Sequence, residues 1–250
     1  MSHAVPKTNE PKSPALSLTM VAFVFMIVTT IVGIVWIARE LSDPAALPIR
    51  RVMVEGEFKH LTTQHVQHAV ADAVHAGFFG VDVADIRDLL QDEAWIREAN
   101  VSRMWPDGLH VTIVEQVPVA RWGDYGLLNE RADVFVPSAE DLPRDLAQLN
   151  GPLGSEQEVL EHFGYIRAQL ADVGLKPIGL SLSDRRAWTV TIEGGHEILL
   201  GRRDLEVRLA RFKWGYTKGL NAAWERIGHV DMRYTNGFAV GERGSVRRNG

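Results

Sequence analysis

Histidine is the residue type whose spacing in this chain comes closest to that of a chemical site. His196 and Glu197 begin as the zinc-protease motif His-Glu-x-x-His does, but the chain continues with three aliphatic residues and supplies no second histidine. That motif needs two imidazoles on one helical face, and residues 197–200 predict a strand. His65 and His68 do lie one helical turn apart, yet no Asp, Glu or Cys joins them at a suitable spacing. We interpret both sets as structural or solvated, and we predict no metal site.

Other catalytic signals are absent from the sequence. It contains no Gly-x-Ser-x-Gly, no phosphate-binding Gly-rich loop and no Gly-x-Gly-x-x-Gly. It contains no cysteine, so neither disulfides nor thiolate metal sites can form. The formal net charge is -5, whereas nucleic-acid-binding proteins usually show a basic face. We expect no enzymatic activity, no cofactor, no small-molecule substrate and no nucleic-acid partner.

Residues 15–38 form a run without any charged side chain. A helix of that length spans roughly 36 Å, enough to cross a hydrocarbon core of about 30 Å. A buried core helix rarely runs this long without a charge. A cleaved signal peptide would have a shorter core of about 7 to 15 residues and a small-residue cleavage site. We predict a single uncleaved transmembrane helix, with the lipid bilayer as its partner.

The charges beside this run do not decide its orientation. Lys7 and Lys12 lie on its N-terminal side, and Arg39, Arg50 and Arg51 lie on the other. The chain that follows contains no second apolar run of membrane length. At about 100 to 200 residues per domain, it is long enough for one or two compact domains.

Residues 49–118 predict a first domain with the order β-α-α-β-β. Two helices would cover one face of a three-stranded sheet, with Ile86, Leu89 and Leu90 on the inner face of the second helix. The predicted elements are a strand 49–55, a helix from Thr62 or Thr63 to Gly77, a loop with Phe78 and Phe79, a helix from Asp82 or Asp85, and strands 99–104 and 109–116.

Residues 119–242 predict a second domain that is rich in strands and contains two helices, which makes the whole chain α+β. A glycine pair, Gly194 and Gly195, predicts a tight hairpin turn. The predicted elements are strands 126–129 and 133–136, a loop 143–152, a helix 155–173, strands 178–183, 188–193 and 197–200, a helix 204–224, and strands 229–234 and 238–240. Three segments are expected outside the domains: a disordered tail 1–14, a linker 39–48 and a disordered tail 243–250.

The last two predicted strands carry few of the devices that block a sheet edge. Residues 230–234 and 238–240 contain neither Lys nor Pro. Such an edge suits β-augmentation, in which a partner's extended segment adds a strand to the sheet. Alternatively, this hairpin is internal to its own sheet. The sequence alone leaves both interpretations open.

The order of elements and the segment from Trp95 to Trp122 together resemble the POTRA module of the FtsQ/DivIB family of bacterial division proteins. The residues in the family's positions are Trp95, Ile96, Val101, Arg103, Trp105, Pro106, Leu109, Val111, Glu115, Pro118 and Ala120. The resemblance implies a POTRA domain at 49–118 and an FtsQ-type β-domain at 119–242. It also implies a single-pass protein of the cell inner membrane, enriched at the division septum, with a cytoplasmic N-terminus and a periplasmic bulk.

The resemblance further implies that the β-domain receives FtsB, which travels with FtsL as a coiled-coil pair. Other membrane proteins of the divisome would bind through the POTRA and transmembrane segments. An Arg that receives an acidic partner residue falls on Arg186, with Arg185 as the alternative. The remaining partner-binding residues implied are Arg233, Tyr234, Asn236, Gly237, Phe238 and Val240.

Two classes of function therefore compete. The first is a non-enzymatic scaffold of cell division, which links early and late division proteins in septum formation. The alternative is a POTRA-bearing assembly or secretion component of the envelope, because POTRA modules elsewhere handle unfolded β-strands. Such components carry a long transmembrane barrel or repeated POTRA units, and this chain predicts neither.

Overall fold

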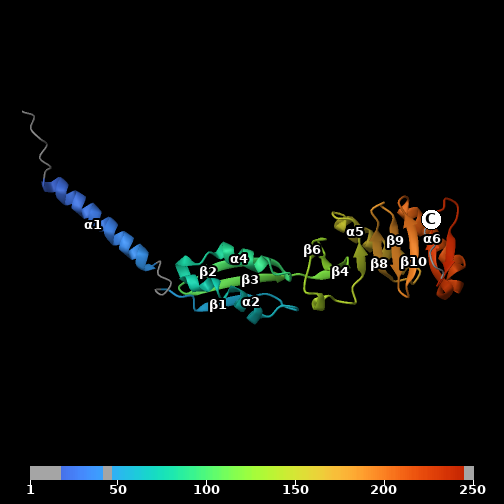
Figure 1. Cartoon of the computed structure of the whole chain (residues 1–250), viewed down its shortest axis with the longest axis horizontal. Helices are drawn as coiled ribbons and strands as arrows, with labels where there is room; N and C mark the ends of the chain where they lie inside the picture. The colour runs from blue at the N-terminus through green and yellow to red at the C-terminus, as the bar shows by residue number, and fades with distance from the viewer. Residues whose placement is uncertain (1–17, 42–46, 245–250) are drawn as a thin grey trace, which may run out of the picture. The chain divides into compact units, whose positions relative to one another are not determined.

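A computed structural model describes residues 18–41 and 47–244, and its first element is the helix α1, Leu18–Leu41 (Figure 1). The hydroxyl of Thr29 donates to the carbonyl of Phe25 at 2.8 Å, and that of Thr30 donates to the carbonyl of Met26 at the same distance. These bonds satisfy the two hydroxyls within the helix itself. Within the described residues, Thr19–Glu40 is the one stretch of helix long and apolar enough to cross a membrane.

The predicted tail 1–14, residues 42–46 of the predicted linker 39–48 and the tail from residue 245 lie outside the described residues, as do residues 15–17 of the predicted transmembrane run.

A three-stranded sheet with the order β1-β3-β2 follows α1 in the chain. Its strands are β1 (Arg51–Glu55), β2 (Ile96–Met104) and β3 (Gly108–Glu115), and β1 pairs parallel with β3 from Arg51↔Gly108 to Glu55↔Thr112. Buried and more exposed residues alternate along β3, with Leu109 and Val111 inside. The alternation indicates that one face of the sheet is covered.

Two helices contribute buried apolar residues to this first part, α2 (Thr63–Val70) and α4 (Val83–Gln91). Thr62 caps α2, because its side chain accepts a hydrogen bond from the N–H of His65 at 3.1 Å. Asp82 caps α4 in the same way, accepting from the N–H of Ala84 at 2.8 Å. The order β-α-α-β-β of the sequence prediction is confirmed.

Three local predictions in this part are wrong. The first helix does not run to Gly77, because α2 ends at Val70 and a 3₁₀ helix η1 (Ala73–Ala76) follows; Phe78 and Phe79 then lie in a short helix α3 (Gly77–Gly80). Leu89 is 45% exposed, whereas Leu90 and Ile86 are buried. The inner face of α4 is therefore made by Ile86 and Leu90.

Residue contacts divide the chain into two units, and the division passes through β2 and β3. Among the described residues, the first unit comprises α1, the chain up to Glu55, and the segments Thr62–Leu90 and Asn100–Thr112. The second unit comprises Gly56–Leu61, Gln91–Ala99 and the chain from Ile113 onward.

The second unit contains a nine-stranded sheet with the order β12-β11-β10-β9-β8-β7-β4-β5-β6. Its strands are β4 (Pro118–Trp122), β5 (Gly126–Asn129), β6 (Val134–Phe135), β7 (Gln148–Asn150), β8 (Pro177–Leu182), β9 (Trp188–Ile192), β10 (His196–Gly201), β11 (Ile227–Asp231) and β12 (Ala239–Glu242). Figure 1 labels five of these strands, β4, β6, β8, β9 and β10. Gly194 and Gly195 both have positive φ in the turn from β9 to β10, as the glycine pair predicted.

Two helices pack against this sheet and form its core. The helix α5 (Glu156–Ala171) contacts β7 and β8, and α6 (Leu205–Lys218) contacts β10. The prediction of a helix to residue 224 is wrong, because α6 ends at Lys218 and a 3₁₀ helix η3 (Leu220–Arg226) follows. The buried cluster includes Val159, Phe163, Ile166 and Leu170 of α5, Leu209 and Phe212 of α6, and Leu180, Val190, Ile198 and Val230 of the strands.

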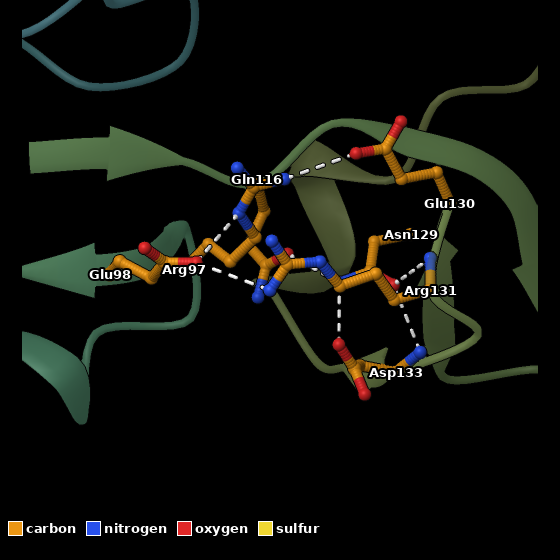
Figure 2. A network of polar contacts seen from close by, with 7 residues as sticks. All are labelled: Arg97, Glu98, Gln116, Asn129, Glu130, Arg131 and Asp133. Atoms are coloured by element: carbon orange, nitrogen blue, oxygen red, sulfur yellow. Dashed lines mark hydrogen bonds and ion pairs between the residues drawn. The ribbon is translucent and has the colours of Figure 1, made fainter.

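A polar network ties the first residues of β2 to the turn after β5 within the second unit (Figure 2). Asn129 is fully buried, and its Oδ1 accepts from the N–H groups of Arg131 and Asp133 at 2.8 and 2.9 Å. Its Nδ2 donates to Gln116 and Asp133. Ion pairs of Arg97 with Glu130 and of Arg131 with Glu98 surround it at 3.4 and 3.2 Å. The buried amide thus has all its hydrogen bonds, as a buried polar group requires.

Candidate functional site

The strand β12 lies at one end of the nine-stranded sheet. It pairs antiparallel with β11, with Val230↔Val240 and Asp231↔Ala239 opposite each other. Within residues 18–41 and 47–244, its other side pairs with no strand. An edge of this kind presents backbone N–H and C=O groups to which an added strand can bond.

The two predicted strands at this edge end elsewhere than expected. The strand β11 stops at Asp231 instead of Tyr234, and β12 begins at Ala239 and runs to Glu242. Arg233 and Tyr234 therefore belong to the loop 232–238 between the strands. We call this segment the closing loop.

The closing loop forms an open hollow, and most of the partner-binding residues expected from the sequence line it. Tyr234 and Asn236 are exposed, and Phe238 is half-buried. The hollow is lined by Tyr234, Thr235, Asn236, Gly237, Phe238 and Ala239. Val240 follows on β12 with an exposed side chain.

Phe238 anchors the end of the closing loop to the core. Its ring packs against the buried cluster and lies so near Gly215 of α6 that a Cβ at Gly215 would be 2.9 Å from Cε1 of Phe238. A side chain at position 215 would push the ring away. Because glycine has no side chain, Gly215 lets the closing loop lie against α6.

Arg211 of α6 fixes the rest of the closing loop, and sequence reasoning did not identify it. Its guanidinium donates to the carbonyl oxygens of Met232 at 2.9 Å, Tyr234 at 2.8 Å and Thr235 at 2.6 Å. Three carbonyls that strand pairing leaves unused thereby obtain a charged donor. No local pattern around residue 211 signals this, because its acceptors lie more than twenty residues further along the chain.

Arg233 is held by the carboxylate of Asp231. Its Nη2 lies 2.6 Å from Oδ2, and its Nε lies 2.9 Å from Oδ1 of the same side chain. Burial by itself raises the pKa of the Asp231 carboxyl, but the hydrogen bonds and charge of Arg233, with a smaller contribution from His229, hold that pKa below its ordinary value. The pKa of Arg233 is raised in turn, chiefly by its hydrogen bond to Asp231. The pair is therefore ionised at neutral pH.

Arg186 lies in the turn between β8 and β9 and adopts a left-handed backbone conformation, with φ of 61°. Its Nη2 contacts both carboxylate oxygens of Glu158 on α5, at 2.7 and 2.6 Å. The neighbouring Arg185 is exposed, and no hydrogen bond or ion pair with another described residue holds it.

The sheet register brings Arg186 and the closing loop to the same end of the strands. Trp188, the first residue of β9, pairs with Gly201 at the end of β10. A Cβ on Gly201 would lie 3.0 Å from Cγ of Arg233. At about 4.8 Å per strand, the distance from β9 to β12 across the sheet is roughly 14 Å. Arg186 and Phe238, which are 52 positions apart in the chain, thus lie at the same end of the strands.

The histidines singled out from the sequence do not form a site. His196 lies in β10, as the strand prediction required, and its Nδ1 is 2.7 Å from the carbonyl oxygen of Ile227. His65 and His68 are exposed on α2. Among the described residues, no group of three or more His, Cys, Asp and Glu side chains could hold a metal ion.

Two protein-family models match the chain. The model described as "Cell division protein FtsQ/DivIB, C-terminal" matches residues 120–233, and that described as "POTRA domain, FtsQ-type" matches residues 47–116. The residues of the closing loop from Tyr234 onward lie beyond the first match.

Curated proteins with the name "Cell division protein FtsQ" are similar to the chain over most of its length. The protein of Hahella chejuensis is 33% identical over 90% of this chain and 78% of its own length. That of Coxiella burnetii is 32% identical over 80% of this chain and 82% of its own. That of Xanthomonas campestris is 35% identical over 78% and 70%, respectively.

Proposed function

The chain belongs to the FtsQ/DivIB family of cell division proteins, and from this we propose that it is a non-enzymatic scaffold of the bacterial divisome that binds the FtsB/FtsL pair through β12 and the closing loop. The partner's extended segment adds a strand to β12. Other division membrane proteins bind through the POTRA-type residues and α1.

The observation that carries the proposal is the position of β12 at the end of its sheet. Main-chain hydrogen bonds to such an edge supply affinity, and side-chain pockets beside it supply specificity. Ala239 lines the hollow of the closing loop and is also the first residue of β12, so the hollow adjoins the start of this strand. A strand added to β12 would thus extend past Tyr234.

The charged side chains at the end of the strands explain how an acidic partner residue could be accepted. Arg233 is exposed on the side away from Asp231, and a guanidinium has five donors, so a second carboxylate can bind it. At Arg186 the carboxylate of Glu158 already occupies the Nη2 side. A partner carboxylate has to compete with Glu158 for Arg186, whereas it could bind Arg185 without displacing another carboxylate.

The proposal includes a topology: the N-terminus is cytoplasmic, and the residues after α1 are periplasmic and concentrated at the septum of the inner membrane. Alkaline phosphatase requires disulfides, which form in the periplasm and not in the cytosol. A fusion of this enzyme after Gly250 is therefore expected to be active, and a fusion before Met1 inactive, when phosphatase activity is measured in whole cells. The reverse pattern would overturn this orientation.

Depletion of the protein in its native host tests the division role directly. A divisome scaffold is needed for septum formation and not for growth or chromosome segregation. Depleted cells are therefore expected to form filaments with separated nucleoids, as seen by microscopy with a DNA stain. Cells of normal length after the protein has disappeared from immunoblots would refute the proposal.

A further inference from the structure

Two short segments of the first unit lie side by side and expose aromatic side chains. One is the single-turn helix α3, and the other is the turn 105–107 between β2 and β3. Arg103 connects them, because its Nε donates to the carbonyl of Phe78 at 3.0 Å and its Nη2 to that of Val81 at 2.5 Å. We call the two turns together the aromatic tip.

The segment that follows α1 in the chain is hydrogen-bonded to both turns. The N–H of Phe78 donates to the carbonyl of Leu47 at 2.8 Å. The N–H of Arg50 donates to the carbonyl of Asp107 at 2.9 Å. The aromatic tip is therefore hydrogen-bonded to the first described residues after α1.

The exposed side chains of the tip are large and apolar. Trp105 is 80% exposed, and Phe79 is 52% exposed. Phe78 beside it is buried and meets the ring of Phe79 edge-to-face at 5.3 Å, which fixes the direction in which Phe79 is presented. Covering these rings would remove apolar surface from water, which is favourable.

The length of the chain limits how far this tip can lie from the membrane. Helix α1 ends at Leu41, and Leu47 is already bonded to the tip. Six peptide steps of at most about 3.6 Å give a reach of roughly 20 Å. A bilayer's polar interface itself adds about 5 to 8 Å on each side of the hydrocarbon core. The tip is thus tethered next to the interface at which aromatic side chains are enriched.

The charges of the tip do not oppose contact with a bilayer surface. Asp107 is the acidic residue of the turn 105–107, and Arg51 pairs with it at 2.7 Å. The run from Gly77 to Val81 contains no charged side chain. An unpaired carboxylate, which an anionic lipid surface would repel, is therefore missing from these two turns.

We propose that the aromatic tip docks onto the lipid bilayer, with Trp105 and Phe79 in the interface beside the end of α1. The contact holds the first unit against the membrane from which it emerges. It requires only that α1 spans the bilayer, so it is independent of FtsB binding and of the orientation of the chain.

Because the chain has no native cysteine, a single spin label can report the environment of one chosen position. The full-length Phe79→Cys variant is labelled and reconstituted in nanodiscs of phosphatidylcholine and phosphatidylglycerol. Relaxation by oxygen, which concentrates in lipid, is compared with relaxation by a water-soluble nickel chelate. The ratio is expected to be several-fold higher than for a label at Leu153→Cys, a position that is 99% exposed in the second unit.

A second substitution separates docking by the tip from mere proximity. In the labelled Phe79→Cys chain, Trp105→Ser is expected to lower the ratio towards that of the Leu153 label, because it removes the other aromatic anchor. The matched change Trp214→Ser, at an exposed tryptophan of α6, should leave the ratio unchanged. Equal ratios for the two labels without further substitution would overturn the proposal. The proposal would also be overturned if the ratio of the Phe79 label fell to that of the Leu153 label in nanodiscs that hold a single chain. That result would mean that a second copy of the chain covers the tip.

Discussion

Replacing Tyr234 with alanine is expected to weaken the proposed binding of the chain to the periplasmic segment of FtsB at least tenfold. The ring is 57% exposed beside the hollow next to β12, where an added strand would bury it. Aromatic anchors of this kind are frequent among hot spots that contribute about 2 kcal/mol or more, and about 1.4 kcal/mol corresponds to a factor of ten. Calorimetric titration of the full-length chain in nanodiscs with an FtsB peptide measures the change.

Tyr125 provides a matched control for this substitution. It is also 57% exposed in the second unit, but it precedes β5, near the other end of the strand order. Tyr125→Ala should leave the affinity for the peptide unchanged. Thermal melts of both variants complete the test: unchanged affinity of a folded Tyr234→Ala chain would refute the site, and a collapsed melt would assign Tyr234 to the core.

The sequence predicted the longer strands of the second unit but not β7 and β4, which lie between β8 and β5 in the sheet. The strand β7 has three residues within a segment predicted to be a loop, yet it pairs parallel with both β4 and β8. Its residues do alternate, but a strand is recognised from alternation over about four to eight residues, so a run of three is too short to identify one. The strand β4 was missed as well. The nine-stranded order depends on both, and only tertiary pairing reveals them.

The sequence indicated a set of residues for the candidate site but not their geometry. The resemblance to the family indicated Arg233, Tyr234 and the following residues. The strand was expected to continue to Tyr234 because residues 229–234 suit a strand, whereas Arg211 binds the carbonyls that a longer ladder would have used. Likewise, nothing in the sequence indicated that Glu158 would bind Arg186, because the two lie 28 residues apart.

Helix α4 illustrates a limit of sequence periodicity. Counting from Ile86, both Leu89 and Leu90 lie at spacings that a helix places on one face. In a helix of nine residues, two turns are too few to separate the alternatives. The structure separates them, since Leu90 is fully buried and Leu89 is not. The difference between adjacent leucines of the same helix can therefore be measured as a difference in stability.

Leu90→Ala is expected to destabilise the first unit by about 2 to 5 kcal/mol, because it removes buried methyl groups and leaves a cavity. Leu89→Ala should change stability by no more than about 0.5 kcal/mol, because Leu89 lies at the surface and alanine is a good helix former. Amide hydrogen exchange of the full-length chain in nanodiscs measures both. The expected result is faster exchange in residues 62–90 and 100–112 of the Leu90 variant alone, because these segments belong to the unit that loses the contact. The opposite order of the two variants would mean that α4 packs through Leu89, and the assignment of its inner face would then have to be reversed.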